Sequence, residues 1–137
     1  MRVSQKLEYA CRAAIQLAKH YDGESPLRLD DLASREHVPA TFLVQILSDL
    51  KQANLVISRR GKSGGYLLSA APADISLARI IEAVDPQLLE EPAVSEGESG
   101  EALHQIWQGL TSTLSEKLQS TTLDQLAHPQ EEPMWFI

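Results

Sequence analysis

The chain has 137 residues, 43% of them hydrophobic, which is enough for one compact domain with an appendage. No apolar run reaches membrane-spanning length, and the N-terminal MRVSQKLEYA lacks the apolar segment of a signal peptide, so we expect a cytosolic protein with no membrane partner. The single cysteine, Cys11, suits a reducing compartment and excludes a disulfide within the chain. The net charge of −7 is uneven: residues 1–72 carry ten Lys or Arg against seven Asp or Glu, and residues 73–137 carry two against twelve, so only the first part suits nucleic acid.

Two helices are predicted at the N-terminus. The first runs from Ser4 to Tyr21, because apolar residues recur at three- and four-residue spacing and Ser4 can cap its first turn. A short strand, Leu27 to Leu29, is expected next. Asp30 is predicted to cap a second helix that runs from about Asp31 to Glu36.

The third predicted helix, Ala40 to Ala53, follows a tight turn made by residues 37–39. Its buried stripe is expected to consist of Leu43, Ile46, Leu47 and Leu50. The opposite face then presents Thr41, Val44, Gln45, Ser48, Lys51 and Gln52. Two helices joined by a tight turn, the second with small polar groups on its outer face, are typical of a helix-turn-helix.

A basic, glycine-rich hairpin is predicted after this helix. The apolar runs 55–57 and 66–68 are interpreted as two strands that flank the sequence RRGKSGG, residues 59–65. Glycine permits the positive φ angles that a tight turn requires. A cationic turn alone is usually only a solvated loop, but directly behind a helix-turn-helix it favours a DNA-binding wing.

The second half of the chain is predicted to contain a capped helix, a linker and a long helix. Ser76 caps the helix that carries Leu77, Ile80, Ile81 and Val84, and residues 85–100 form an acidic linker. The long helix runs from about Glu101 to Gln119. Its apolar stripe is interpreted as a dimerisation surface rather than a face packed on its own domain, and consists of Leu103, Ile106, Trp107, Leu110, Leu114 and Leu118.

These elements define the expected organisation. The fold class is mainly α with a small β-wing, a winged helix-turn-helix domain followed by a long C-terminal dimerisation helix. The expected boundaries are 1–84 for the DNA-binding domain, 85–100 for the linker, 101–127 for the dimerisation helix and a short turn of helix, and 128–137 for the tail. The tail ends in Met134, Trp135, Phe136 and Ile137, four apolar residues that either fold back on the protein or dock elsewhere as a linear motif.

The sequence resembles the Rrf2 family of bacterial winged-helix regulators, the IscR, NsrR and CymR type. The likeness rests on the amphipathic first helix, the wing phrase ANLVISRRGKSGGYLLS and the phrase STTLDQL near the end, and covers nearly the whole chain. The cysteine-free linker and the terminal isoleucine are most similar to the cluster-free, cysteine-metabolism type of regulator, CymR. The resemblance implies a sequence-specific homodimeric regulator, a repressor by that likeness.

The residues expected to meet DNA lie on the third helix, the wing and the N-terminus. Gln45 can bond adenine in bidentate fashion, and Phe42 either packs on a thymine methyl or belongs to the core. In the resembling family the arginine that matches Arg60 enters the minor groove. The full set of DNA-binding candidates is Arg2, Ser4, Thr41, Phe42, Gln45, Lys51, Arg59, Arg60, Lys62 and Ser63.

No cofactor is expected. The resemblance implies that iron–sulfur members hold their cluster with three cysteines in the segment that matches residues 85–100, and this segment contains none. Glu8 and His104 fall where some members place a ligand, but without thiolates they cannot hold such a cluster. The alternative function is a redox, metal or small-ligand sensor of the same fold that uses Cys11, or Glu8 and His104. Cys11 lies on the apolar face of the first helix, where a buried structural thiol is the usual outcome.

Enzymatic activity is not expected, because the sequence has no activated-nucleophile motif, and the glycines of GKSGGY lack the spacing of a phosphate-binding loop. The resemblance implies a partner instead. In the CymR type a tail that ends in isoleucine enters the active site of cysteine synthase, and Ile137 supplies the same apolar side chain and free carboxylate.

Overall fold

The computed structural model describes residues 1–129, so the tail residues Met134, Trp135, Phe136 and Ile137 lie outside the described part of the chain. Over that range the fold is mainly helical with one two-stranded antiparallel sheet, which confirms the predicted fold class. Among residues 1–129, no helix combines the length and the hydropathy needed to cross a membrane.

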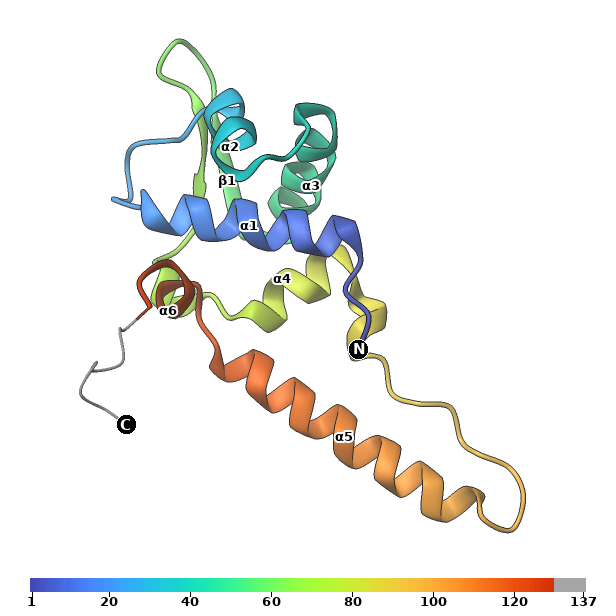
Figure 1. The fold of residues 1–137 in the computed structure, drawn as a ribbon. Coiled ribbons are helices and arrows are strands. Elements are labelled where there is room, and N and C mark those ends of the chain that lie inside the picture. Colours follow the sequence, from blue (N-terminus) through green and yellow to red (C-terminus); the bar gives the residue numbers. More distant parts are fainter. Residues whose placement is uncertain (130–137) are drawn as a thin grey trace, which may run out of the picture.

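Helix α1 (Gln5–Lys19) lies at the centre of the body, between α2 and α3 on one side and α4 on the other (Figure 1). Ser4 caps it as predicted, because the Leu7 N–H donates to Ser4 Oγ at 3.2 Å. Its buried face contains four alanines, Ala10, Ala13, Ala14 and Ala18, besides Leu7 and Leu17. Small side chains on a central helix let neighbouring helices approach closely on both sides.

Helix α2 (Leu29–Glu36) begins two residues earlier than predicted, and the expected cap was wrong. Arg28 is the N-cap and makes no side-chain capping bond, while Asp30 lies in the first helical turn. An acidic residue in a first turn is stabilised by the helix dipole without capping the helix, so the same sequence signal fits both positions. The helix ends at Glu36, and the next residue, His37, has a left-handed φ of 54° and turns the chain into α3.

Helix α3 (Ala40–Gln52) buries the stripe expected of it. Leu43, Ile46, Leu47 and Leu50 are each at most 1% exposed. Pro39 is the N-cap rather than the first helical residue. The opposite face of α3 is open along its length and forms one side of the site described below.

Strands β1 (Val56–Arg59) and β2 (Gly65–Leu68) pair antiparallel from Val56 opposite Leu68 to Arg59 opposite Gly65. They form the wing, which extends beyond α2 (Figure 1). The predicted strand from Leu27 to Leu29 is reduced to one bridge, in which Leu27 pairs with Tyr66, because α2 already begins at Leu29.

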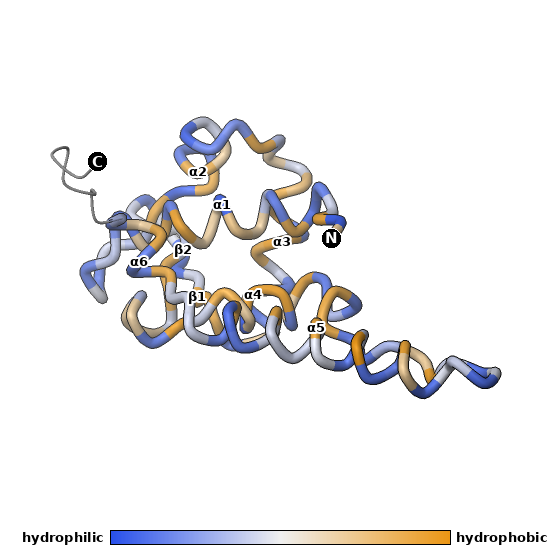
Figure 2. The backbone as a smooth tube through the Cα atoms, turned by 60° about the horizontal axis from the view of Figure 1, so that its bottom comes forward, coloured by the Kyte–Doolittle hydropathy of each residue, from blue (hydrophilic) through white to orange (hydrophobic). Residues whose placement is uncertain are grey.

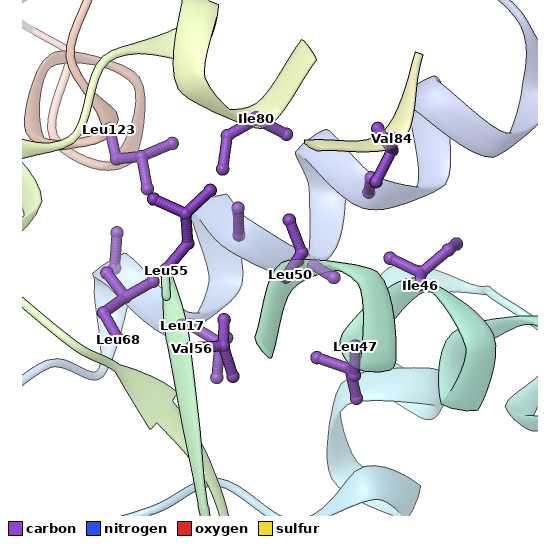
Figure 3. Close-up of a cluster of buried hydrophobic side chains, with 14 of the residues drawn as sticks. Leu17, Ile46, Leu47, Leu50, Leu55, Val56, Leu68, Ile80, Val84 and Leu123 are labelled. Carbon is purple, nitrogen blue, oxygen red and sulfur yellow. The ribbon is translucent and has the colours of Figure 1, made fainter. Parts of the chain in front are cut away.

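A single hydrophobic core joins elements that are far apart in the sequence. Five buried side chains from separate elements lie together next to α1 (Figure 3): Leu50 of α3, Leu55 before β1, Leu68 of β2, Ile80 of α4 (Leu77–Val84) and Leu123 of α6 (Leu123–Ala127). All five are at most 2% exposed. The C-terminal helix α6 is therefore part of the core that holds the DNA-binding elements in place.

A short backbone bridge joins the start of α4 to the start of α6. Ser76, which caps α4, forms an antiparallel bridge with Thr122, which caps α6 in a capping box with Gln125. Two backbone bonds extend the bridge, from Leu77 N–H to the Thr121 carbonyl at 2.8 Å and from Leu123 N–H to the Ile75 carbonyl at 2.9 Å. Segment 101–127, expected to hold a long helix and a short turn of helix, contains α5 on the outside and α6 in the core.

Helix α5 (Gly100–Ser120) runs along the side of the body away from α2, α3 and the wing (Figure 1). The expected linker before it begins with a short 3₁₀ segment, η2 (Pro86–Leu89). A second 3₁₀ segment, η1 (Pro72–Asp74), precedes α4 and lies outside the linker. Leu88 and Leu89 of η2 pack on the core, so the linker is anchored at its start.

Candidate nucleic-acid interface

The outer face of α3 presents every polar side chain that the sequence predicts for it. Thr41, Gln45, Ser48 and Lys51 are all exposed, and they lie on the face opposite to the buried leucines. A helix with a fully buried back and an open front of short polar groups has the shape that fits the major groove of B-form DNA.

Asp49 organises two side chains at the edge of this face. Its Oδ2 lies 2.7 Å from Lys6 Nζ of α1, and its Oδ1 accepts from Gln45 Nε2 at 3.1 Å. The ion pair offsets the negative charge of Asp49, which would otherwise repel phosphate. Gln45 keeps one amide hydrogen and its amide oxygen free, and this donor–acceptor pair is the one that adenine takes in the major groove.

Phe42 lies outside the core. Its side chain is 54% exposed and meets Tyr9 of α1 edge to face, with ring centroids 6.2 Å apart. Tyr9 is itself held by Gln5, whose Nε2 donates to its hydroxyl at 2.9 Å, and by the Arg12 guanidinium 5.5 Å from its ring centre. Of the two readings of Phe42, the packed core residue is wrong, and the ring is available at the surface.

The end of α3 is joined to the wing. Lys51 Nζ donates to Ser58 Oγ of β1 at 2.8 Å. An ammonium group carries three donors, so two of the Lys51 hydrogens remain for phosphate oxygens. The bond also connects the end of α3 to β1 of the wing.

The wing places Arg59, Arg60, Lys62 and Ser63 in solvent, where a DNA backbone could reach all four. The sharp turn of the hairpin contains two glycines, Gly61 and Gly64. A Cβ on Gly64 would lie 2.4 Å from the Arg59 carbonyl oxygen, so no larger residue fits there without moving the backbone. The cations are thus presented by a tight, glycine-dependent turn.

At the N-terminus, Arg2 is exposed but the Ser4 hydroxyl is already engaged. Ser4 Oγ accepts from Leu7 N–H and donates to Asp85 Oδ2 at 3.3 Å. Its only O–H hydrogen is therefore used within the fold, and a phosphate contact at Ser4 would have to come from its backbone. Arg2 stays a candidate on exposure and charge.

Sequence reasoning missed Arg28. The residue lies in a segment predicted as a strand, yet its guanidinium Nη1 donates to the Lys62 carbonyl oxygen in the wing at 3.1 Å. It lines one groove with Arg59, Arg60 and Lys62. Thirty-four positions separate the partners, and no local pattern in the sequence signals such a contact.

The apolar stripe predicted for dimerisation divides into two parts on α5. Leu103, Ile106, Trp107 and Leu110 are between 45% and 57% exposed, whereas Leu114 is half-buried and Leu118 packs on the core of its own chain. The hydropathy view shows the hydrophobic positions of α5 lying along the part that extends beyond the body (Figure 2). Four large exposed apolar side chains on one helix face are typical of a surface that another chain covers.

The residues named for metal or redox sensing are not gathered into a site. Within residues 1–129 no three His, Cys, Asp or Glu side chains lie close enough to hold a metal ion. Glu8 pairs with Arg12 at 3.2 Å, and the buried Nδ1 of His104 has no hydrogen-bond partner among the described residues. Burial, followed by the negative charge of Glu8, raises the pKa of the Cys11 thiol from 9.0 to about 11. The thiol is therefore protonated at neutral pH, which makes it a poor metal ligand and a poor nucleophile.

A helix-turn-helix, a cationic wing and an open recognition face define a winged-helix DNA-binding regulator. Comparison with known proteins gives the family. The model of the Rrf2 family, described as an iron-dependent transcriptional regulator, matches residues 3–129, and the chain belongs to this family. The resemblance found in the sequence is thereby confirmed.

Two curated relatives show how far the likeness extends. A helix-turn-helix-type transcriptional regulator of Mycobacterium tuberculosis is 38% identical over 132 residues, which cover 93% of this chain and 81% of that protein. The regulator IscR of Vibrio atlanticus is 33% identical over 135 residues, which cover 96% and 78%.

Solved structures agree with the sequence comparison. CymR, the global cysteine regulator of B. subtilis, superposes with a TM-score of 0.84 at 31% identity, covering 96% of this chain and 99% of that one. IscR of T. potens superposes with a TM-score of 0.78 at 29% identity, covering 100% and 97%. The chain is thus a transcriptional regulator similar both to IscR and to CymR.

Proposed function

We propose that this regulator is a cytoplasmic homodimeric repressor that reads a pseudo-palindromic operator. Helix α3 enters the major groove of each half-site, where Gln45 and Thr41 meet base edges, and the wing places Arg60 in the adjacent minor groove. The observation that supports this most is that α3 and the wing lie on the same side of the body (Figure 1). The polar residues of α3 and the cations of the wing are exposed.

The dimer is proposed to form through α5. Two-fold operators require two recognition helices at a fixed spacing, and a symmetric interface supplies that spacing. The exposed stripe Leu103, Ile106, Trp107 and Leu110 lies on the helix farthest from the DNA-reading elements. Pairing through this stripe would leave both α3 faces and both wings free.

The family description implies iron, and the donors of this chain do not fit an iron–sulfur cluster. Residues 85–100 contain no cysteine. The one cysteine, Cys11, is largely buried with a raised pKa, and Glu8 is already paired with Arg12. Because clusters are held mainly by thiolates, we propose that regulation proceeds without one.

The test of DNA reading is operator selection followed by a salt titration. The full-length chain selects a duplex from a random-sequence pool, and its affinity for that duplex is measured with and without Arg60→Ala. Losing a guanidinium from a narrow minor groove is expected to weaken binding by about 1–3 kcal/mol and to flatten the salt dependence. Equal affinity and an unchanged salt slope in the variant would refute the docking model.

The regulatory partner is proposed to be cysteine synthase, which would hold the C-terminal Ile137. This rests on the apolar ending of the chain and on its similarity to a cysteine regulator. Deleting Ile137 alone is expected to abolish binding to cysteine synthase and leave operator affinity unchanged. Equal binding of the enzyme to the full and shortened chains would exclude the tail as the contact.

A second candidate is a ligand sensor that uses the core. A cavity of about 260 Å³ lies between α1, α4 and the end of α5, lined by apolar side chains with Cys11 and Glu8 at its wall. A small apolar molecule bound there would touch both the dimer helix and the central helix. Operator binding that changes with a metabolite in a chain lacking Ile137 would favour this function over the tail model.

A further inference from the structure

We propose that Arg28 is a positioning residue of the wing, which holds the wing tip in the orientation that DNA requires. The inference rests on the proposed function, because it assumes that the wing contacts DNA. Its starting point is the bond from Arg28 Nη1 to the Lys62 carbonyl oxygen at 3.1 Å.

The wing tip has little of its own to hold it. Paired residues end at Arg59 and Gly65, and beyond them the turn contains one backbone bond, from Gly64 N–H to the Gly61 carbonyl at 3.0 Å. A two-stranded hairpin is only marginally stable by itself in water. A contact from the body of the protein to the tip therefore limits where Arg60 and Lys62 can point.

Arg28 is placed for this task by its own backbone. Leu27, the residue before it, exchanges two backbone bonds with Tyr66, each at 2.8 Å. Gly65 allows the two segments to come together, because a Cβ there would lie 2.4 Å from the Leu27 carbonyl oxygen. The chain at position 28 is thus fixed against β2 close to the turn of the wing, and the side chain needs to span only the remaining distance to Lys62.

The choice of partner also indicates positioning rather than charge pairing. Arg28 lies in a groove of about 670 Å³ beside Arg59, Arg60 and Lys62, with Glu24 and Asp31 on the same wall. Within residues 1–129 it forms no ion pair with either acid. Its guanidinium instead donates to a neutral carbonyl oxygen, so the bond fixes geometry without pairing opposite charges.

The consequence is preorganisation. A wing held in its bound orientation loses less conformational freedom when it meets the duplex, and this raises affinity without a new contact. The effect of Arg28 on DNA binding must then depend on the wing cations that it positions. A residue that only added its own charge to the interface would act independently of them.

A double-mutant cycle tests this dependence. The affinity of the full-length chain is measured for the duplex that the unchanged protein selects from a random-sequence pool, with Arg28→Ala, Arg60→Ala and both changes together. Arg28→Ala is expected to weaken binding about 5- to 10-fold in the natural chain and by less than about 2-fold in the Arg60→Ala background. Equal losses in the two backgrounds would overturn the positioning role.

Two further variants make the result unambiguous. Arg79→Ala removes the same charge from an exposed site on α4 and is expected to change affinity by less than about 2-fold. Arg28→Lys keeps the charge on a side chain one atom shorter and is expected to lose most of what Arg28→Ala loses, so full affinity in this variant would also overturn the proposal. If Arg60→Ala binds normally, the proposed function itself fails; if only the Arg28 variants bind normally, the inference alone fails. Thermal melting of each variant verifies that it is folded.

Discussion

At the residue scale, the surroundings of Cys11 determine the protonation state of its thiol. Burial and the nearby Glu8 carboxylate both disfavour the thiolate, and together they raise its pKa to about 11. Arg12 follows directly in sequence, but its guanidinium is directed to Glu8 and to the Glu36 carbonyl oxygen at 3.1 Å. No cation therefore activates the thiol, and the structure favours a packing role for Cys11 over redox sensing.

The raised pKa predicts a specific loss of stability at alkaline pH. The unfolded chain releases the thiol proton near pH 9, whereas the folded chain keeps it until about pH 11, so the free energy of unfolding falls across this window. The loss from this group reaches at most about 2–3 kcal/mol. Urea unfolding of the natural chain and of Cys11→Ala at pH 8 and pH 11 measures it.

The comparison removes the other titrating groups, which are common to both chains. The stability gap between the natural chain and Cys11→Ala should move in favour of the variant as the pH rises. A gap that stays constant would mean that the thiol is not buried in the folded protein.

At the scale of elements, the wing depends on one close approach of backbone to backbone. Gly65 has a φ of +145°, and its position leaves no room for a Cβ next to Leu27. The joint fixes β2 of the wing to the segment just before α2. Substituting this glycine should damage the joint rather than the hairpin turn.

Gly65→Ala is expected to destabilise the fold by about 2–4 kcal/mol, because a 2.4 Å contact must be relieved by moving the backbone. Gly61→Ala is the matched control, since Gly61 also has a positive φ, +101°, but nothing lies within 4 Å of its Cβ position. Only the strain of the φ angle applies there, about 1 kcal/mol. Thermal or urea unfolding compares the two, and equal losses would contradict the close approach.

At the scale of the whole molecule, the elements proposed for DNA binding and for dimerisation are on separate sides of the protein. Helix α3 and the wing lie on one side of the body, and α5 lies on the other (Figure 1). Helix α6 and the Ser76–Thr122 bridge return the chain from α5 to that core. If α5 pairs two protomers as proposed, a change in that pairing would reach α1 and α4 through directly packed residues.

The proposed dimer predicts a difference between the two faces of α5. Ile106→Asp places a charge in the exposed apolar stripe and is expected to convert the dimer to monomer, with a loss of operator affinity of at least about a hundredfold because half-sites are no longer bound together. Ser112→Asp adds the same charge to an exposed position on the polar side of the helix. Sedimentation and titration with the selected duplex measure both variants.

The Ser112→Asp chain should stay dimeric and bind normally. A dimeric Ile106→Asp chain, or two variants that both dissociate, would mean that another surface pairs the protomers. Because Ile106 is exposed within one chain, each monomer should keep its helical content and show this in circular dichroism.

Elements with a strong local pattern were predicted well. The stripe of α3 and the caps at Ser4 and Ser76 each depend on residues within a few positions of one another, so the sequence carries the whole signal. The start of α2 was wrong, because Asp30 suits a cap and a first helical turn equally. Phe42 was undecided for a similar reason: its place on the helix fits a boundary position, and only the packing of α1 shows that it is exposed.

The sequence by itself determined the helix-turn-helix, the cationic hairpin and the family, since periodicity, caps and glycine turns are properties of short segments. The tertiary structure decided what lies between distant segments: Arg28 reaching Lys62 in the wing, α6 entering the core, and Leu118 turning inward while Ile106 stays outside. Such contacts depend on how rigid elements pack around α1. The free energy that selects them is summed over the whole core, so no local stretch of sequence encodes it.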